Sequence, residues 1–505
     1  MHDVVIVGGG PVGLFLACEL GLAGCSVLVL EREPEPGSPF KAEPLGLRGL
    51  SAASVEAFYR RGMLDRLLTV ATVPDGFGAD PAQAPTPPRR GGHFAGMMLD
   101  GAKFDDSTLP FRLPSPASAG LLTSLEAVEA VLSEQASKLG VDVRRGVTVS
   151  SLTHDEEGVV ARAGADEYPA RWLVGCDGGR STVRRLAGFD FVGTEPQFTG
   201  YRLHAAVVDP EKLRYGFNLT PTGMYLQLGE GNIGIMDFDG GAFDRSQEPT
   251  REHLQAVLRR VSGTDVTLGE VHLASTFTDR AMQTTTYRRG RVLLAGDAAH
   301  IHSPLGGQGL NTGIGDAVNL GWKLAATVLG QAPDGLLDTY TRERHPIGAK
   351  VLDWSRAQVA IMSPDPHAQA IQAVVRDLLS TVDGTTYVLD RISGTSVRYD
   401  LGAEHPLIGR SAPDLRLEDG PALGDLMEDG RGLLLDFSAG GCLSGPASAW
   451  ESRIRYAAGP ARNDLGVGAV LVRPDGVVAW AGDRRPDREA FERAAARWFV
   501  TPATH

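Results

Sequence analysis

The stretch DVVIVGGGPVGLFLACELGLAGCSVLVLE, residues 3–31, decides the fold class of this chain. A β-branched run leads into a glycine-rich turn, an apolar helical pattern and a second strand that ends in Glu31. The turn has the spacing G-x-G-x-x-G at Gly8, Gly10 and Gly13. Strand, glycine turn, helix, strand and terminal acid in this order are typical of a dinucleotide-binding βαβ unit. The stretch therefore predicts an α/β fold with a Rossmann-like nucleotide site.

The glycines and the acid of this unit have separate predicted roles. Gly8 makes the tight turn, Gly10 lets a pyrophosphate approach the backbone, and Gly13 lets the helix pack closely on the strand. Glu31 is expected to accept hydrogen bonds from a ribose diol. With the start of the helix and the residue after the acid included, the predicted nucleotide contacts are Gly8, Gly10, Pro11, Val12, Gly13, Glu31 and Arg32.

A second glycine-rich stretch, RVLLAGDAAHIHSPLGGQGLNTGIGDAVNLGWKL, covers residues 291–324. It predicts a buried strand over 292–295, a carboxylate at the strand end, a glycine loop and a helix beginning near Gly309. Glycines before a helix start let a flat group approach the backbone, and the positive helix end favours negative charge. Taken alone, this stretch also fits an ordinary strand-loop-helix corner. As a binding site it contributes Gly296, Asp297, Pro304, Gly307, Gly309, Leu310 and Asn311.

Composition narrows the classes of function. The 505 residues are 42% hydrophobic and 22% charged, which is typical of a globular enzyme with two or three domains. The formal net charge of −13 argues against nucleic acid or an anionic membrane surface as a partner. The four cysteines show no CxxC spacing, which suits a reducing cytosol. The sequence shows no apolar span of membrane length and no signal peptide, so we expect a cytoplasmic protein.

Three motifs follow one another along the chain: GGGPVG with Glu31-Arg32, GCDGGRSTVRR over 175–185, and AGDAAHIHSPLGGQGLN over 295–311. In this combination the chain resembles the group A FAD-dependent aromatic hydroxylases of the para-hydroxybenzoate hydroxylase fold. Within that group it is most similar to bacterial enzymes that oxidise aromatic polyketides and related antibiotics. The resemblance implies FAD as the cofactor, with Asp297 on its ribityl chain and 304–311 beside the isoalloxazine ring. It also implies NADPH or NADH as a transient reductant.

The resemblance adds contacts outside the two glycine sites. It places Asp177 near the FAD pyrophosphate and Arg180 or Arg184 where a phosphate of NAD(P)H is captured. From the residues alone, Asp177 can also cap the helix that follows it. Val149 is the expected adenine contact.

Two positions depart from the family's pattern. An ungapped comparison puts Gly46 where the family usually has an arginine against the flavin, which leaves Arg48 as the nearby substitute. Leu125 stands where relatives often carry a glutamine that reaches the flavin. We therefore include Arg48 and Leu125 among the expected cofactor contacts, with the details of flavin docking open.

The resemblance also implies a domain plan. An FAD-binding domain is interrupted by a middle domain whose antiparallel sheet covers the flavin and supplies the substrate pocket. A C-terminal thioredoxin-like domain follows, and it is not expected to do redox work because Cys442 has no CxxC partner. The predicted boundaries are 1–70, 113–185 and 276–385 for the FAD-binding domain, 71–112 and 186–275 for the middle domain, and 386–505 for the C-terminal domain.

Local patterns predict the elements of these domains. The expected helices are 51–68, 124–139, 251–261, 336–358, 364–379 and 488–499. A kink or restart is expected at Arg344-His345-Pro346, within the helix 336–358. The helix 364–379 is expected to end the FAD domain, near Gly384. The expected strands are 92–99, 141–143, 147–151, 171–175, 202–208, 223–228, 232–238 and 432–437, with a hairpin of 465–472 and 477–481. The substrate-pocket candidates on the middle strands are Tyr201, His204, Tyr225, Gln227 and Met236.

The residues supply no catalytic machinery of their own. His300 and His302 lack further ligands for a metal site, and we interpret them as loop histidines that bond the backbone. We expect no catalytic side chain, because the cofactor carries the chemistry. The resemblance implies that NAD(P)H reduces FAD, and that O2 then forms a C4a-hydroperoxide which hydroxylates a polycyclic aromatic substrate. Baeyer–Villiger oxygenation of a ketone and a catalytically idle flavin-binding protein remain as alternatives, and we expect a monomer or a homodimer.

Overall fold

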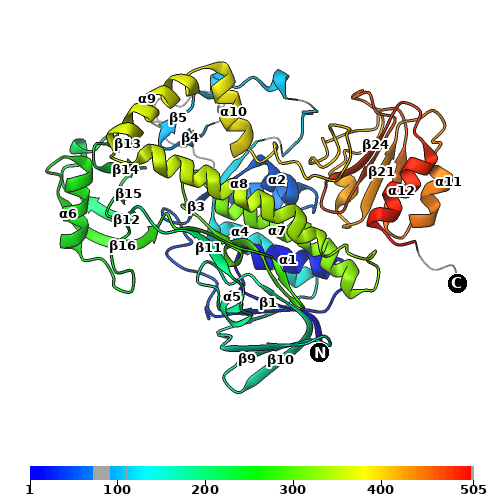
Figure 1. The fold of residues 1–505 in the computed structure, drawn as a ribbon, viewed down its shortest axis with the longest axis horizontal. Coiled ribbons are helices and arrows are strands. Elements are labelled where there is room, and N and C mark those ends of the chain that lie inside the picture. Colours follow the sequence, from blue (N-terminus) through cyan, green and yellow to red (C-terminus); the bar gives the residue numbers. More distant parts are fainter. Residues whose placement is uncertain (72–90, 110, 118, 502–505) are drawn as a thin grey trace.

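The computed structural model describes residues 1–71, 91–109, 111–117 and 119–501. Figure 1 shows a central body of sheet and helices, a second sheet with α6 (Arg251–Ser262) at one end, and a C-terminal unit at the other. Within these ranges no helix is both long and apolar enough to cross a membrane.

The main sheet places the ends of three strands together. Among the described residues it has eight strands, in the order β18-β19-β10-β1-β2-β7 with β9 on β10 and β8 on β9. The register pairs Val7 with Gly175 and Gly175 with Leu294, so the carboxyl ends of β1, β10 and β19 meet at one edge. Ligands of open α/β sheets bind at such an edge. The strands are β1 His2–Val7, β2 Val27–Glu31, β7 Asp142–Arg145, β8 Ser151–His154, β9 Val159–Ala163, β10 Asp166–Gly175, β18 Arg288–Arg289 and β19 Val292–Leu294.

Two predicted strands of this region need correction. The strand expected over 141–143 is β7, which extends to Arg145. The strand expected over 147–151 instead begins at Ser151. Residues 147–150 form no strand because Gly146, left-handed at φ 72°, bends the chain out of β7.

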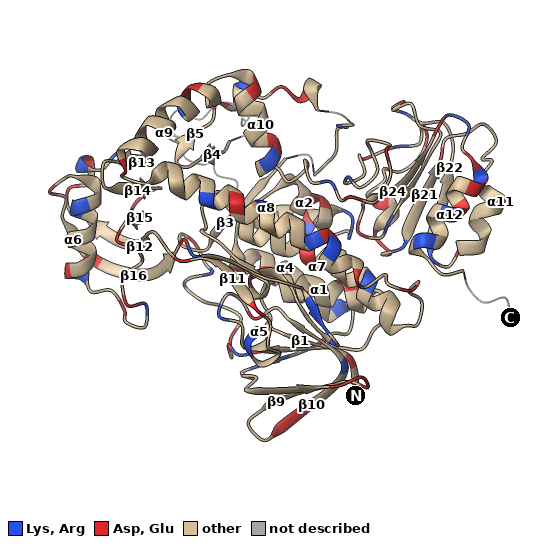
Figure 2. Cartoon of the chain, viewed as in Figure 1, with Lys and Arg blue, Asp and Glu red and all other residues tan. Residues whose placement is uncertain are grey.

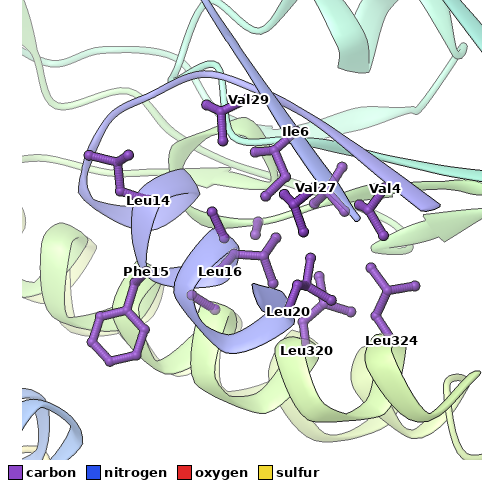
Figure 3. Close-up of a cluster of buried hydrophobic side chains, with 14 of the residues drawn as sticks. Val4, Ile6, Leu14, Phe15, Leu16, Leu20, Val27, Val29, Leu320 and Leu324 are labelled. Atoms are coloured by element: carbon purple, nitrogen blue, oxygen red, sulfur yellow. The ribbon is translucent and has the colours of Figure 1, made fainter. Parts of the chain in front are cut away.

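The core of the body lies between the sheet and two helices. Figure 3 shows leucines of α1 (Pro11–Leu22) facing Val4 and Ile6 of β1, with Leu320 and Leu324 of α7 (Gln308–Val328) on the other side. These side chains are fully or almost fully buried, and each such burial contributes ~1.5–3 kcal/mol. The third helix of this layer, α4 (Leu125–Lys138), begins as predicted, where the Ser124 hydroxyl caps the N–H of Ala127.

The remaining helices differ from the predictions at glycine and proline. The helix expected over 51–68 is two helices, because Gly62 takes a left-handed conformation at φ 66° between them. The restart expected at Pro346 does not occur. α8 runs through the exposed proline, which removes one N–H bond only. Gly384 lies inside a helix that the sequence did not predict. These helices are α2 Ala52–Tyr59, α3 Leu64–Val70, α5 Thr182–Leu186, α8 Thr339–Met362, α9 Pro366–Leu379 and α10 Val382–Ile392.

The middle sheet is antiparallel, as predicted, and α6 covers one of its faces. Its five strands within the described residues have the order β13-β14-β15-β12-β16. α6 begins at the Thr250 cap and ends at Gly263, which is left-handed at φ 69°. The strands are β12 Thr199–Val207, β13 Gly216–Thr220, β14 Gly223–Gln227, β15 Asn232–Asp237 and β16 Leu268–Thr278.

Short strands connect the body to the middle sheet. The strand expected over 92–99 is a tight hairpin, because Ala95 and Gly96 both have positive φ and turn the chain back. Residues 72–90 and 110 of the excursion predicted over 71–112 lie outside the described residues. The short strands are β3 Leu47–Leu50, β4 His93–Phe94, β5 Met97–Met98, β6 Leu121–Ser124, β11 Phe191–Thr194, β17 Ala281–Thr284 and β20 His300–Ile301.

The C-terminal unit has the predicted thioredoxin-like sheet. Its order is β22-β21-β23-β24, with β21 parallel to β22 and antiparallel to β23. Cys442 is exposed, and the four cysteines, all within the described ranges, are free thiols. The elements are β21 Gly432–Asp436, α11 Ser444–Ala447, β22 Ile454–Ala458, β23 Ala469–Val472, β24 Val478–Gly482 and α12 Arg488–Trp498.

A buried ionic cluster joins this unit to the body. Lys323 of α7 and Arg473 of the C-terminal unit both bond the carboxylate of Glu343 on α8, each at 2.8 Å. Arg473 also pairs with Asp475, and both arginine and lysine side chains are fully buried. Burial alone would raise the pKa of Glu343, but the two cations outweigh it and hold that pKa below its usual range. The C-terminal unit is therefore fixed to α7 and α8 by charges that water does not reach.

Candidate active site

The glycine turn after β1 shows three different local geometries. Gly8 has φ 110°, and a Cβ on it would lie 2.3 Å from the carbonyl oxygen of Cys176. A Cβ on Gly13 would lie 2.0 Å from the Gly8 oxygen, so both positions require glycine for packing. A Cβ on Gly10 would meet only Glu129 Oε1, at 4.0 Å. Gly10 thus faces open space at the start of α1, as a pyrophosphate-facing glycine must.

The acid after β2 is held in place by the backbone. Glu31 accepts hydrogen bonds from the N–H of Gly9 at 2.6 Å and of Glu33 at 2.9 Å. Carboxylates have about four lone-pair sites, so capacity remains for a ribose diol. The neighbouring Arg32 is exposed and pairs with Glu33. Val149 is buried in the core beside this strand end.

Two charged residues near Gly10 were missed by the sequence reasoning. Lys41 donates to Glu129 of α4 at 2.8 Å, and Glu129 is the group nearest to Gly10. Burial raises the pKa of Glu129, against the opposing effect of Lys41. Neither residue belongs to a motif, since a loop and a helix far apart in sequence bring them together. They place a cation and a buried carboxylate at the edge of the predicted pyrophosphate site.

Asp297 and Asp316, near the end of β19, differ in burial and in the contacts of their carboxylates. Asp297 is exposed, and within the described part of the chain its carboxylate forms no hydrogen bond or ion pair. Asp316, fully buried on α7, instead supports the loop by accepting the Gly296 N–H at 3.0 Å and contacts from His300 and Arg344, each at 2.7 Å. Burial would raise the pKa of Asp316, but Arg344 and His300 lower it below its usual range. This division favours a ligand-binding role for Asp297 over a structural corner.

The two histidines of the loop behave differently. His302 bonds the backbone through Nδ1, as expected, while His300 bonds the Asp316 carboxylate instead. The buried Nε2 of His302 has no partner in the described structure, and it lies near Gly309 and Asp297. No group of three metal-ligating side chains occurs among the described residues, so we propose no metal site.

The start of α7 has free space beside Gly307 and is held by hydrogen bonds at Asn311. Gly307 is left-handed at φ 64°, and a Cβ on it would meet nothing within 4 Å. Its turn is closed by the Gly307 N–H on the Pro304 oxygen at 3.1 Å. Both polar atoms of the Asn311 side chain bond protein groups. Its nitrogen donates to Gly307 and Gly49, and its oxygen accepts from Ser51 and Ser54. Asn311 therefore ties the helix start to α2, a role that the sequence did not predict. Leu310 packs against the core of the body.

In the GCDGGRSTVRR motif, Asp177 and Arg184 form hydrogen bonds to other protein groups. Asp177 accepts from the N–H groups of Thr182 and Val183, so it caps α5 as one interpretation predicted. Arg184 donates to the carbonyl oxygens of Gly179 and Ala298, which ties α5 to the loop of Asp297. Arg180 is exposed and remains available for a phosphate.

The two departures from the family pattern lie against each other. Leu125 donates its N–H to the Gly46 oxygen at 3.0 Å, at the start of α4. Arg48 lies on β3, where Nη1 donates to the oxygens of Leu45 and Leu47. Burial lowers the pKa of Arg48, while the charge of Asp297 opposes that shift. The charges of Arg48 and Asp297 therefore interact.

The register of the middle sheet divides the five pocket candidates between its two faces. Tyr201 and Tyr225 are buried in the cluster that packs against α6, behind the sheet. Gln227 stands two residues from Tyr225 on β14, so it shares that face. His204 and Met236 lie on the opposite face, and Met236 packs with Met224 and Leu226 there. The period of two assigns the faces, but only the strand pairing shows which face α6 covers.

Arg202 is a half-buried cation on the face opposite α6. Its Nη2 donates to Asn232 at 3.4 Å, while its buried Nε has no partner in the described structure. No described carboxylate forms an ion pair with it. Burial, and then the positive charge of Arg48, lower its pKa to about 10. Sequence reasoning missed it, although a single arginine inside the apolar strand GYRLHAAV is the pattern that marks such a site.

These observations fit a bound flavin dinucleotide. Open backbone at Gly10 and Gly307, an unbonded carboxylate at Asp297, and the orphaned Nε2 of His302 lie along one edge of the body. A buried polar atom without a partner costs ~1–3 kcal/mol, which a ligand contact would offset. Arg202 adds an unpaired cation on the middle sheet.

Comparisons with known proteins identify the family. Residues 1–355 match the FAD binding domain model, and residues 405–502 match the aromatic-ring hydroxylase C-terminal domain. A protein from Claviceps purpurea named as a monooxygenase is 46% identical over 508 residues, covering 99% of this chain and 98% of its own. A rifampicin monooxygenase from Streptomyces venezuelae is 40% identical over 516 residues, covering 99% of both chains.

Solved structures agree. The anhydrotetracycline hydroxylase OxyS from Streptomyces rimosus aligns with a TM-score of 0.85 at 36% identity, over 99% of this chain and 100% of its own. The Diels-Alderase PyrE3 of pyrroindomycin biosynthesis aligns with a TM-score of 0.81 at 35% identity, over 99% of both chains. The fold and site therefore define an FAD-binding flavoprotein with an aromatic-ring hydroxylase C-terminal domain. This chain belongs to the FAD-dependent aromatic hydroxylase family and is a flavin-dependent monooxygenase.

Proposed function

We propose that this monooxygenase uses NADPH or NADH to hydroxylate an acidic polycyclic aromatic compound of the polyketide or antibiotic type. The names of the relatives support this substrate class, since they act on rifampicin and anhydrotetracycline. The domain division predicted from the sequence, with the middle sheet as the substrate domain, is part of this proposal.

The observation that carries the proposal is the arginine pair at Arg48 and Arg202. Both side chains are half-buried, the positive charge of Arg48 disfavours that of Arg202, and Arg202 has no carboxylate partner among the described residues. A charge that is partly withdrawn from water and left unpaired is destabilising. An anionic oxygen of the substrate would remove that cost, whereas a neutral hydrocarbon would not. The pair therefore favours a phenolate, an enolate or an acidic quinone.

The protein's own groups position the reaction. FAD, when bound, would supply the oxygen-transfer chemistry, with NAD(P)H as the reductant and O2 as the oxidant. Asp297 and Glu31 hold hydroxyl groups of the cofactor, and the N-terminus of α7 favours negative charge beside the ring. Arg202 and His204 orient the substrate from the middle sheet, and Arg180 is available for the phosphate of the reductant.

The test is NAD(P)H consumption by the FAD-loaded protein over a panel of hydroxynaphthoquinones, anhydrotetracyclines and neutral polycyclic hydrocarbons. Acidic substrates should stimulate consumption and gain one oxygen atom. Arg202→Met should raise KM for the best acidic substrate about tenfold or more, the cost of one charge-assisted hydrogen bond, with unchanged FAD content. Arg202→Lys should restore part of that loss. Equal KM values for wild type and Arg202→Met would show that Arg202 does not bind the substrate.

The same assay separates the alternatives. The likeness to PyrE3 gives a specific reason to include a pericyclic reaction, which would give an isomeric product without NAD(P)H consumption. Baeyer–Villiger oxygenation also adds one oxygen, but it places that oxygen inside a ring or chain, as product connectivity would reveal. An idle flavin protein would consume no reductant with any compound of the panel.

A further inference from the structure

A cavity lies beside the C-terminal unit. It has a volume of about 430 Å³ and is walled by α1, α2, α7, α8, α10, the segment after α10 and the C-terminal unit. Of the stretch predicted to lie beside the flavin ring, Gln308 and Asn311 line it. The Asn311 amide is already saturated by protein groups, so the cavity is not an extension of the flavin site.

The charges on its wall are unbalanced. Two carboxylates line the cavity, Glu19 and Asp475, and each is held by a buried arginine, Arg61 and Arg473 respectively. The lining cations outnumber them: they are Arg60, Arg61, Arg344, Lys350, Arg391 and Arg398.

Three of these cations remain without a carboxylate. Within the described residues Lys350 forms no hydrogen bond or ion pair, and it is exposed on α8. Arg391 donates only to the Tyr387 oxygen at 3.0 Å and lies over that ring. Arg398 donates to backbone oxygens, including that of Ile408 at 2.9 Å. Figure 2 shows basic segments at the end of α10 and beside α2, facing the strip between the body and the C-terminal unit.

One side of the wall is apolar and aromatic. Ile347, Val351 and Trp354 follow one face of α8, and Val397 and Tyr399 come from the segment opposite. Trp354 packs its edge against Phe94 at 4.8 Å between ring centres, which fixes the indole in the wall. Ligand cavities of ~300–1,000 Å³ at domain junctions, apolar with a few converging polar groups, are typical small-molecule sites.

We propose that this cavity binds an aromatic organic anion, a fused-ring compound that carries a carboxylate, sulfonate or phenolate group. The rings lie between Trp354 and Val397, and the anionic group lies toward Lys350 and Arg391. Such a ligand contacts α8, α10 and the C-terminal unit at once. The site is independent of the substrate oxidised at the flavin, because it is formed by a different set of residues.

The test uses two probes on the FAD-loaded protein: 8-anilinonaphthalene-1-sulfonate, an aromatic anion, and N-phenyl-1-naphthylamine, its neutral analogue. Fluorescence titration gives a Kd for each. Lys350→Glu and Arg391→Glu should each weaken binding of the sulfonate about five- to tenfold, as expected for reversing one charge several ångströms away in a hydrated site. Binding of the neutral probe should change less than twofold. Arg485→Glu, an exposed reversal on the C-terminal unit outside the cavity, is the matched control and should change neither.

Both reversed side chains are exposed, so the variants should fold, and their melting temperatures verify this. Wild-type affinity for the sulfonate in both cavity variants would overturn the proposal. An equal loss of affinity for the neutral probe, or an equal loss of sulfonate affinity in Arg485→Glu, would also overturn it. Either result would show that the charge of this cavity does not contribute to binding.

Discussion

The N–H of Leu125 donates to the carbonyl oxygen of Gly46 at 3.0 Å, so the two departures from the family pattern are one structural feature. A Cβ on Gly46 would lie 1.9 Å from the Lys41 oxygen, which excludes an arginine at that position. The chain places Arg48 near Asp297 and Lys41 near Gly10 instead. Cations remain available to a cofactor, but they come from neighbouring positions of the same loop.

Gly10→Val should remove the yellow colour of the purified protein without unfolding it. The added side chain enters the open space that the pyrophosphate needs, and no protein atom lies within 4 Å of its Cβ except Glu129 Oε1 at that limit. FAD content per chain and apo melting temperature are the measurements. Gly13→Val is the matched control, because its Cβ would lie 2.0 Å from the Gly8 oxygen and should destabilise the fold itself. Wild-type FAD content in Gly10→Val would contradict the pyrophosphate site.

Asp297→Ala should weaken FAD binding about ten- to a hundredfold, the cost of ~1.5–3 kcal/mol for losing a charge-assisted acceptor. The apo melting temperature should hardly change, because the exposed carboxylate has no protein partner in the described structure. FAD titration and melting of the apo-protein measure the two effects.

Asp316→Ala is the contrasting variant. It leaves Arg344 buried without its carboxylate, which typically costs ~3–5 kcal/mol of stability. Unchanged FAD affinity together with a lower apo melting temperature in Asp297→Ala would mean that Asp297, too, is a structural residue.

Acid should loosen the β4–β5 hairpin through His93. Burial lowers the pKa of His93 to about 4, from an ordinary value near 6.5. Between these values the unfolded chain binds a proton that the folded chain excludes, so stability falls as the pH drops from about 6.5 to 4. The loss from this one group reaches ~3 kcal/mol at the lower limit. The Gly96 N–H donates to His93 Nδ1, and protonation would break that bond.

Denaturant unfolding at several pH values tests this prediction. His93→Phe keeps a ring beside Phe217 and should show a flatter decline of unfolding free energy between pH 6.5 and 4. His367→Gln, at the exposed start of α9, should retain the wild-type slope. Parallel pH curves for wild type and His93→Phe would show that His93 is not the titrating group.

Glu343→Gln should release the C-terminal unit from the body. The substitution leaves Lys323 and Arg473 buried without their shared carboxylate, and breaking such a cluster typically costs ~3–5 kcal/mol. Urea unfolding and limited proteolysis of the C-terminal unit are the measurements. Glu134→Gln, which removes an exposed partner of Arg66 and Lys138, should leave both unchanged. Equal stability of the two variants would mean that the buried cluster does not hold the unit.

Local patterns in the sequence were enough to predict those parts of this protein that depend on a few neighbouring residues. The glycine spacing at Gly8, Gly10 and Gly13 requires a tight turn, an open backbone and a close helix contact, and each demand acts within a few residues. The Ser124 cap and the β-branched strands were equally readable. The break of the expected helix at Gly62 and the unbroken course of α8 through Pro346 could not be predicted, because packing against neighbours overrides weak local preference.

Which side chains meet depends on the tertiary fold. The fold puts Tyr201 on the face toward α6 and Arg202 on the opposite face, since a one-residue difference in register reverses every side chain of a strand. It shows that Asp316 supports the loop, while Asp297 has no bonding partner among the described residues. The positive cavity beside the C-terminal unit forms from segments that no motif links. Its charge imbalance arises from which arginines find carboxylates in three dimensions, and sequence spacing holds no record of that pairing.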